Sequence, residues 1–261
     1  MSRLTAHWHQ MISNACFGLL PAIPYAPTDD AACQGVAINA HNLAVAPAPG
    51  SPLAFSGANF EIPCGCRTAL IGANGSGKST LLRALAGLTP IASGEVKVLG
   101  AKPSLGRSRI AYLAQKPSFN QDAPLLLRRL VQMGTYSHHG WFEECEHGDE
   151  AVDRALSRLG LLELSERSVH TLSGGQLQRG LLARATVQGA ELLLLDEPFA
   201  ALDQTSREIV ESFLFNPDNS FTVVMATHDP ADSQRFDRVL ELKNGQLTTV
   251  HACAGHNHRH A

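Results

Sequence analysis

The residues with the clearest chemical potential are the glycines, the lysine and the hydroxyls between Gly72 and Thr80. They follow the pattern G-x-x-x-x-G-K-S, which stands between an apolar run at 68–71 and a helix-like run at 81–86. Glycines let backbone N–H groups approach a polyphosphate closely, and a helix that begins there adds a partial positive charge. We therefore predict a nucleotide-phosphate site. Its expected residues are Gly72, Asn74, Gly75, Ser76, Gly77, Lys78, Ser79 and Thr80.

A carboxylate pair at Asp196 and Glu197 could complete the chemistry of that site. Phosphoryl transfer to water needs a ligand for Mg²⁺ and a group that handles the attacking water. The four leucines at 192–195 indicate a strand buried on both faces of a parallel sheet. Carboxylates at the end of such a strand are costly to bury unless something pairs with them. We expect Asp196 to bind Mg²⁺ and Glu197 to act as a general base; an ordinary acidic turn is the alternative.

A second anion-binding feature lies at 172–179, with the sequence LSGGQLQR. Ser173 is a favourable N-cap for a helix that continues through 180–185, and its free N–H groups would attract an anion. One chain has difficulty in placing both features on the same phosphate. Two chains packed head to tail could complete each other's sites.

These segments together resemble the nucleotide-binding subunit of ABC transporters over roughly residues 36–250. The segment 72–80 is similar to the Walker A motif, 172–176 to the LSGGQ signature, and 192–197 to Walker B with the catalytic glutamate. The resemblance implies an α/β fold: a P-loop NTPase ABC cassette with a RecA-like core, an antiparallel β subdomain and a helical signature subdomain. Its cofactors would be ATP and Mg²⁺.

The resemblance also implies roles for residues in shorter motifs. Residues 201–203 look like the D-loop, 227–229 like the switch-histidine segment, and Gln115 like the Q-loop glutamine. The implied catalytic residues are Glu197, His228 and Gln115. The implied metal ligands are Ser79, Gln115 and Asp196. The residues that would contact nucleotide across a dimer are Ser173, Gly174, Gly175, Gln176 and Asp203.

Three of these residues have simpler interpretations. Gln115 could be a polar residue at the end of a strand. His228 could have no role beyond capping the helix that follows it. Asp203 could be the N-cap of a helix at 204–215, a role compatible with a place at a dimer interface.

The chain departs from the family pattern where an aromatic residue usually stacks on adenine. The segment 46–52 reads APAPGSP and contains no aromatic residue. Phe55 lies nearby, but the alternation of Phe55, Ala58 and Phe60 is typical of strand packing. We therefore expect weak discrimination between purine bases.

Composition bounds the domain organisation and the class of partner. The chain has 261 residues, 44% of them hydrophobic, and a net charge of −3, which does not suggest nucleic-acid binding. No apolar run approaches the ~18–20 residues that a membrane span needs. We predict a loosely ordered N-terminal extension at 1–35, an ATPase domain at 36–250 with a helical subdomain at about 116–175, and a His-rich tail at 251–261.

The six cysteines show no disulfide framework, and we expect all of them to be thiols. Cys64-Gly65-Cys66 could be part of a thiolate metal site or a tight turn between two strands, and the turn is the favoured interpretation.

The cargo is indicated by histidines and by a second resemblance. Four histidines lie in the tail, and three more lie at 138–147 among acidic residues; imidazole favours ions such as Zn²⁺, although both clusters could simply be solvated. The segment 133–142, MGTYSHHGWF, looks like one found in ATPases that serve zinc, manganese and iron-chelate importers. This resemblance implies a homodimer of ATPase subunits at the cytoplasmic face of the inner membrane, an integral membrane permease and an extracytoplasmic metal-binding protein. Zinc is the first choice and manganese the next; an exporter ATPase or a soluble ABC ATPase remains an alternative.

Overall fold

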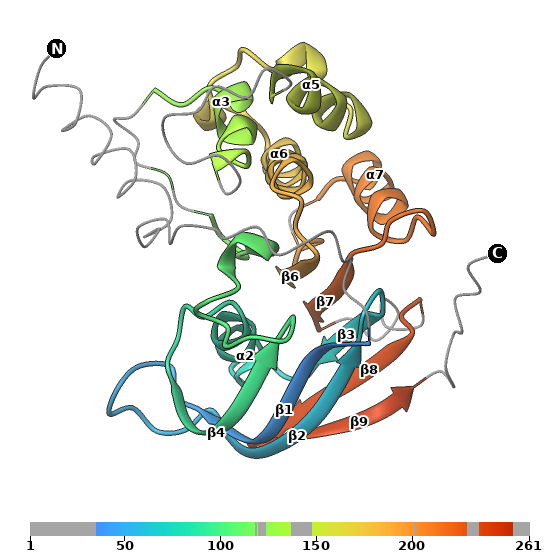
Figure 1. Ribbon diagram of the computed structural model, residues 1–261. Helices are drawn as coiled ribbons and strands as arrows, with labels where there is room; N and C mark the ends of the chain where they lie inside the picture. Colours follow the sequence, from blue (N-terminus) through green and yellow to red (C-terminus); the bar gives the residue numbers. More distant parts are fainter. Residues whose placement is uncertain are drawn as a thin grey trace, which may run out of the picture. The chain divides into compact units, whose positions relative to one another are not determined.

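The computed structural model describes residues 35–117, 119, 124–136, 148–200, 202–228 and 235–252 (Figure 1). All but the last residue of the predicted N-terminal extension, most of the His-rich tail and the histidines at 138–147 lie outside the described residues. The described part of the chain forms two compact units. The first, here the sheet unit, contains 35–113, Glu191–Pro198 and 215–252; the second, here the helical unit, contains residues of Ala114–Ala190 and Phe199–Leu214.

The sheet unit is built on a six-stranded sheet with the order β5-β6-β7-β3-β8-β9. Neighbours from β5 to β8 are parallel, and β9 is antiparallel to β8. Strands β6 and β7 are buried along their whole length, which explains the leucine run at 192–195. The strands are β3 (Arg67–Ile71), β5 (Ile110–Leu113), β6 (Leu192–Asp196), β7 (Thr222–Thr227), β8 (Arg238–Lys243) and β9 (Gln246–Ala252).

A three-stranded antiparallel sheet, β2-β1-β4, completes the sheet unit. Apolar and polar positions alternate at 36–60, and this segment forms β1 (Val36–Val45) and most of β2 (Phe55–Pro63). Strand β4 (Ile91–Val98) pairs with β1. The helix α2 (Lys78–Leu85) contributes Leu81, Leu82 and Leu85 to the same hydrophobic core as Phe55. This packing fixes the beginning of α2, which follows the predicted phosphate loop. A short 3-10 turn, η1 (Arg107–Arg109), precedes β5.

The helical unit consists of short helices around α6. Its elements are α3 (Leu127–Gln132), α5 (Gly148–Arg158), η2 (Leu162–Leu164), η3 (Val169–Thr171), α6 (Gly174–Val187) and α7 (Gln204–Leu214). Gly180 allows α3 to approach α6, because a Cβ at this position would lie 2.7 Å from Cδ1 of Leu127. Two residues after the end of α3, a Cβ at Gly134 would lie 2.5 Å from the carbonyl oxygen of Arg184 in the last turn of α6. Glycines thus set the close packing of these two helices.

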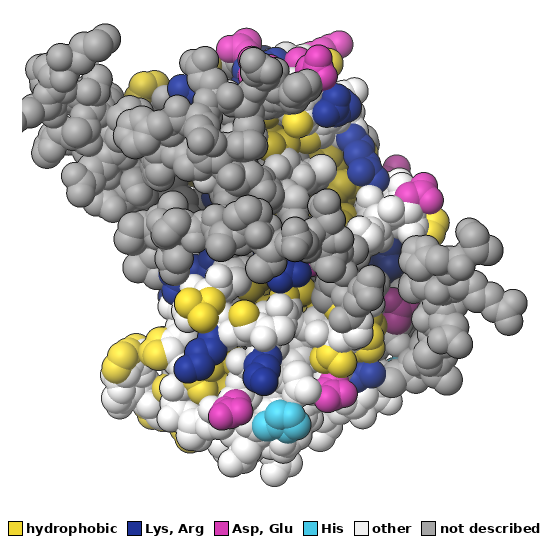
Figure 2. All heavy atoms as spheres, viewed as in Figure 1, with side chains coloured by type: hydrophobic (Ala, Val, Ile, Leu, Met, Phe, Trp, Pro, Cys, Tyr) yellow, Lys and Arg dark blue, Asp and Glu magenta, His cyan; other side chains and the backbone are white. Residues whose placement is uncertain are grey.

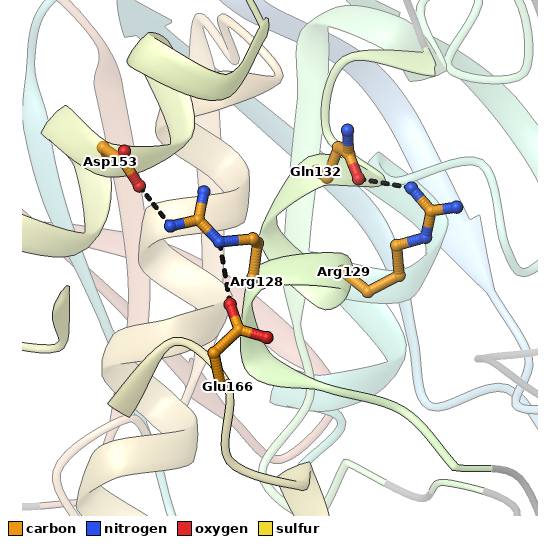
Figure 3. Close-up of polar contacts among 5 residues, drawn as sticks. All are labelled: Arg128, Arg129, Gln132, Asp153 and Glu166. Atoms are coloured by element: carbon orange, nitrogen blue, oxygen red, sulfur yellow. Dashed lines mark hydrogen bonds and ion pairs between the residues drawn. The ribbon is translucent and has the colours of Figure 1, made fainter. Parts of the chain in front are cut away.

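Arg128 on α3 connects three parts of the helical unit (Figure 3). Its guanidinium donates to Asp153 of α5 at 2.6 Å and to Glu166 at 3.1 Å, and its backbone N–H donates to the carbonyl of Ser165 at 2.8 Å. Partly exposed ion pairs of this kind are each worth only about 0–1 kcal/mol. Their effect is geometric: one side chain holds α3, α5 and the segment after η2 in a fixed arrangement.

The expectation that all six cysteines are thiols is wrong. Cys64 is disulfide-bonded, whereas Cys66 is not part of a disulfide. A disulfide requires two Cα atoms within about 4.4–6.8 Å, a proximity that cysteine spacing does not reveal. The 64–66 segment does form a tight turn, with Gly65 at φ 71° and the Cys66 N–H donating to the Pro63 carbonyl. Among the described residues there is no group of three or more His, Cys, Asp or Glu that could hold a metal ion.

Within the described ranges, no helix is both long and apolar enough to cross a membrane. On the face in Figure 2, the Lys and Arg side chains of the described residues are interspersed with acidic and apolar ones.

Candidate nucleotide-binding site

The loop between β3 and α2 has the backbone geometry of an anion-binding turn. Gly77 is the N-cap of α2 with φ 106°, and no described side chain caps the helix. A Cβ at Gly72 would lie 2.4 Å from the Leu242 carbonyl oxygen, so only glycine fits there. Gly75, with φ 78°, faces open space. The first amides of α2 are therefore available to an anion, which the helix dipole also attracts.

Two polar side chains of the loop are buried beside it. Lys78 is 5% exposed, and its ammonium donates to the carbonyls of Gly72 at 2.8 Å and Ala73 at 3.0 Å. The hydroxyl of Ser76 is buried and has no hydrogen-bond partner among the described residues. A buried polar group is normally hydrogen-bonded, so an unpartnered one at this place fits a ligand oxygen.

Asp196 ends β6 and is almost completely buried. Burial raises its pKa, the hydrogen bond from Ser79 opposes that rise, and the negative charge of Glu197 adds to it. The Tyr112 hydroxyl donates to Oδ2 at 3.4 Å. A carboxylate and a hydroxyl are hard oxygen ligands of the type that Mg²⁺ prefers, so Ser79 and Asp196 fit this ion.

Glu197 and His228 lie at the ends of neighbouring strands. The Glu197 N–H donates to the Ala226 carbonyl at 3.1 Å, and His228 Nδ1 lies 3.6 Å from Glu197 Oε2. The Glu197 side chain is 14% exposed, against 59% for His228. Glu197 also has a left-handed backbone, with φ 48°. Such a conformation costs about 1–3 kcal/mol in a non-glycine residue and is concentrated at functional sites.

The phosphate loop, Asp196, Glu197 and His228 thus all belong to the sheet unit, at the carboxyl ends of β3, β6 and β7. Ligands of open α/β sheets bind at this edge.

The other predicted site residues belong to the helical unit. Ser173 caps α6 in a capping box: its hydroxyl accepts from the Gln176 N–H at 3.2 Å, and the Gln176 side chain accepts from the Ser173 N–H at 3.0 Å. Gly174 and Gly175 form the first two positions of α6. Asp203 caps α7, with Oδ1 accepting from the Ser206 N–H at 2.8 Å. The exposed Gln115 follows the end of β5 by two residues.

Sequence reasoning missed Tyr112 and Ser206, which contact predicted site residues directly. Burial raises the pKa of Tyr112 first, and Asp196 raises it further, so its hydroxyl stays a donor at neutral pH. A signal for Tyr112 was present, because its strand ends two residues before Gln115 and Tyr112 is the one hydroxyl-bearing residue in that apolar strand. Ala201 and Asp229, at the ends of two short motifs, lie outside the described residues.

The segment 46–54 contains no aromatic residue on which a nucleotide base could stack. Phe55 is 1% exposed and pairs with Val45 of β1, which confirms that it packs in the core. Ala54 approaches the phosphate loop instead: its Cβ would lie 3.0 Å from a Cβ placed at Gly77. Beside it, Leu53 is 53% exposed.

GTP should therefore compete with ATP almost equally. Competition against a labelled nucleotide should give inhibition constants for ATP and GTP within about threefold, because the aromatic contact that would add ~0.5–1.5 kcal/mol is missing from 46–54. A tenfold or larger preference for ATP would contradict this prediction. The same competition assay, carried out on the Lys78→Ala variant, controls for nucleotide binding outside the phosphate loop.

Comparisons with known proteins show the family of the chain. The family model described as ABC transporter matches residues 55–200. The chain is 40% identical over 187 residues to the zinc transport system ATP-binding protein TroB of Treponema pallidum, covering 70% of each protein. It is 38% identical over 192 residues to the manganese transport system ATP-binding protein MntB of Halalkalibacterium halodurans, covering 72% of this chain and 76% of that one.

A solved structure shows the same fold. The dimeric ATP-binding cassette MJ0796, in a post-hydrolysis state with ADP and Pi, matches with a TM-score of 0.70 and 26% identity, over 82% of this chain and 99% of that one. The predicted cassette fold is therefore confirmed. The phosphate loop, the carboxylates at the end of β6 and these comparisons lead to one conclusion: the chain belongs to the ABC transporter family and is an ATP hydrolase.

Proposed function

We propose that this protein is the ATPase subunit of a membrane ABC importer for a transition metal, with zinc as the first choice and manganese as the next. The observation that carries the proposal is the similarity to ATP-binding proteins of zinc and manganese transport systems at 40% and 38% identity. The segment 133–142 and the histidine-rich tail support it. An iron-chelate importer is a further candidate within the same class.

In this proposal the sheet unit binds and hydrolyses ATP. The loop amides and Lys78 would hold the phosphates, and Ser79 and Asp196 would hold Mg²⁺. The ion, when bound, supplies positive charge that offsets the charge of the phosphate oxygens. Glu197 accepts a proton from the attacking water as general base, and His228 supports the developing charge. The 3.6 Å approach of His228 to Glu197 and the burial of Asp196 support these roles.

The proposed partners follow from the placement of the signature. Ser173 and Gly174 are exposed, and Gly174 and Gly175 begin a helix, so this end can cover the γ-phosphate on a second copy of the chain. Gln176 and Asp203 would lie at the same dimer interface. The dimer would act at the cytoplasmic face of the inner membrane, together with an integral membrane permease. An extracytoplasmic metal-binding protein would deliver the metal to that permease. We propose no nucleic-acid partner.

Metal content of cells tests the proposal. The measurement is the zinc and manganese content of metal-starved cells, determined by mass spectrometry. Cells that carry the native protein are compared with cells that carry Glu197→Gln, and an immunoblot confirms equal protein levels. A selective fall in zinc with Glu197→Gln is the expected result, and a selective fall in manganese would favour the second metal. A rise in either metal would indicate export, and no change in any metal would reject a metal cargo.

A further inference from the structure

Ser206 fixes both oxygens of the Asp203 carboxylate. It stands at the third position of α7 and is 2% exposed. Its backbone N–H donates to Oδ1 at 2.8 Å and its hydroxyl donates to Oδ2 at 2.9 Å. These bonds lower the pKa of Asp203, first through the backbone N–H and then through the hydroxyl. An exposed aspartate would otherwise sample several rotamers, so a buried serine here selects one of them.

The same serine lies against the first turn of the signature helix. A Cβ at Gly175 would lie 2.5 Å from the Ser206 hydroxyl, 2.8 Å from its Cβ and 3.3 Å from Asp203 Oδ2. Contacts shorter than 3.0 Å are essentially never seen for real Cβ atoms, so this approach requires glycine. Ser206 therefore occupies the space between the beginning of α6 and the Asp203 carboxylate.

Arg179 holds the same region from the next turn of α6. It lies four residues after Gly175, is 8% exposed, and donates to the carbonyls of Leu159 at 2.8 Å and Gly160 at 3.3 Å. Burial lowers its pKa, and the charge of Asp203 acts in the opposite direction. The end of α5, the first turns of α6 and the beginning of α7 are thus joined around Asp203.

From this arrangement we infer that Ser206 is a positioning residue for ATP-driven dimerisation. It holds Asp203 and the signature residues Ser173–Gly175 in one fixed geometry, so that they reach the nucleotide of the second protomer together. The inference rests on the proposed dimer of ATPase subunits. Ser206 itself need not touch nucleotide, because it acts through Asp203 and through its packing against Gly175.

The test is dimerisation of the full chain with ATP, in the Glu197→Gln background that preserves bound nucleotide. Sedimentation of Ser206→Ala should show a dimer dissociation constant about tenfold higher, as expected for the loss of a hydrogen bond to a charged group. Affinity of the monomer for a fluorescent ATP analogue should stay within about twofold, because the substitution leaves the phosphate loop unchanged. Thr205→Ala, an exposed neighbour on the same turn, is the matched control and should dimerise like the parent.

A double-mutant cycle separates positioning from a general structural role. Once Asp203 is alanine, Ser206→Ala should weaken dimerisation much less than it does in the parent, because the carboxylate that it orients is gone and only its packing against Gly175 remains. Additive effects would overturn the inference, as would normal dimerisation of Ser206→Ala. If the Glu197→Gln parent itself stays monomeric with saturating ATP, the dimer of the proposed function fails, and the inference fails with it.

Discussion

Glu197→Gln should reduce the rate of ATP hydrolysis by about 10²–10⁴-fold, the usual contribution of a general base. Glutamine has nearly the same shape, so it preserves the backbone bond to Ala226 while removing the group that accepts a proton. Because the phosphates are held by the loop between β3 and α2, nucleotide affinity should stay within about twofold of the native value. Steady-state phosphate release and equilibrium nucleotide binding are the two measurements.

Glu208→Gln is the matched control for this prediction. Glu208 is an exposed residue of α7 that accepts a hydrogen bond from Gln204, and its substitution should leave turnover unchanged. Native turnover in Glu197→Gln would remove Glu197 from the proposed role. A parallel loss of nucleotide affinity would instead indicate that the carboxylate is needed to form the site.

Lys78→Ala should weaken nucleotide binding by about 10–100-fold, the range for losing hydrogen bonds between charged groups. The ammonium is buried and already aimed at the loop through the carbonyls of Gly72 and Ala73. Its loss therefore removes the positive charge that would meet the phosphates, and it also leaves two carbonyls without their donor. Titration calorimetry with ATP measures the affinity directly.

Lys97→Ala serves as the control for the loss of one positive charge, because Lys97 is an exposed residue of β4. Unchanged affinity in Lys78→Ala would contradict the assignment of the phosphate loop. The midpoint of thermal unfolding of both variants shows whether the lost carbonyl bonds alter stability separately from binding.

Local signals in the sequence predicted much of the fold. The leucine run at 192–195 forms a fully buried strand, and Ser173 forms the expected N-cap of α6. Asn244 and Gly245, a residue pair that favours hairpin turns, both have positive φ and form the turn between β8 and β9. Each of these features depends on residues that are close in the chain.

Features that depend on distant residues were not predictable. In the apolar run that follows Pro124, α3 begins only at Leu127, because the N–H groups of Leu127 and Arg128 donate to the carbonyls of Arg167 and Ser165. The pairing of β4 with β1 also joins segments separated by the phosphate loop and α2. The contacts of Tyr112 with Asp196 and of Ser206 with Gly175 arise in the same way, from packing that no local pattern encodes.

The left-handed backbone of Glu197 sets stability and catalysis in opposition at a single position. Glycine adopts this conformation without steric cost, so a search for thermostable variants would tend to select glycine here and lose the general base. The proposed chemistry therefore requires a glutamate at a position where glycine would give the more stable backbone. Stabilised versions of this ATPase should consequently be sought at other positions, where backbone strain and chemistry are not joined.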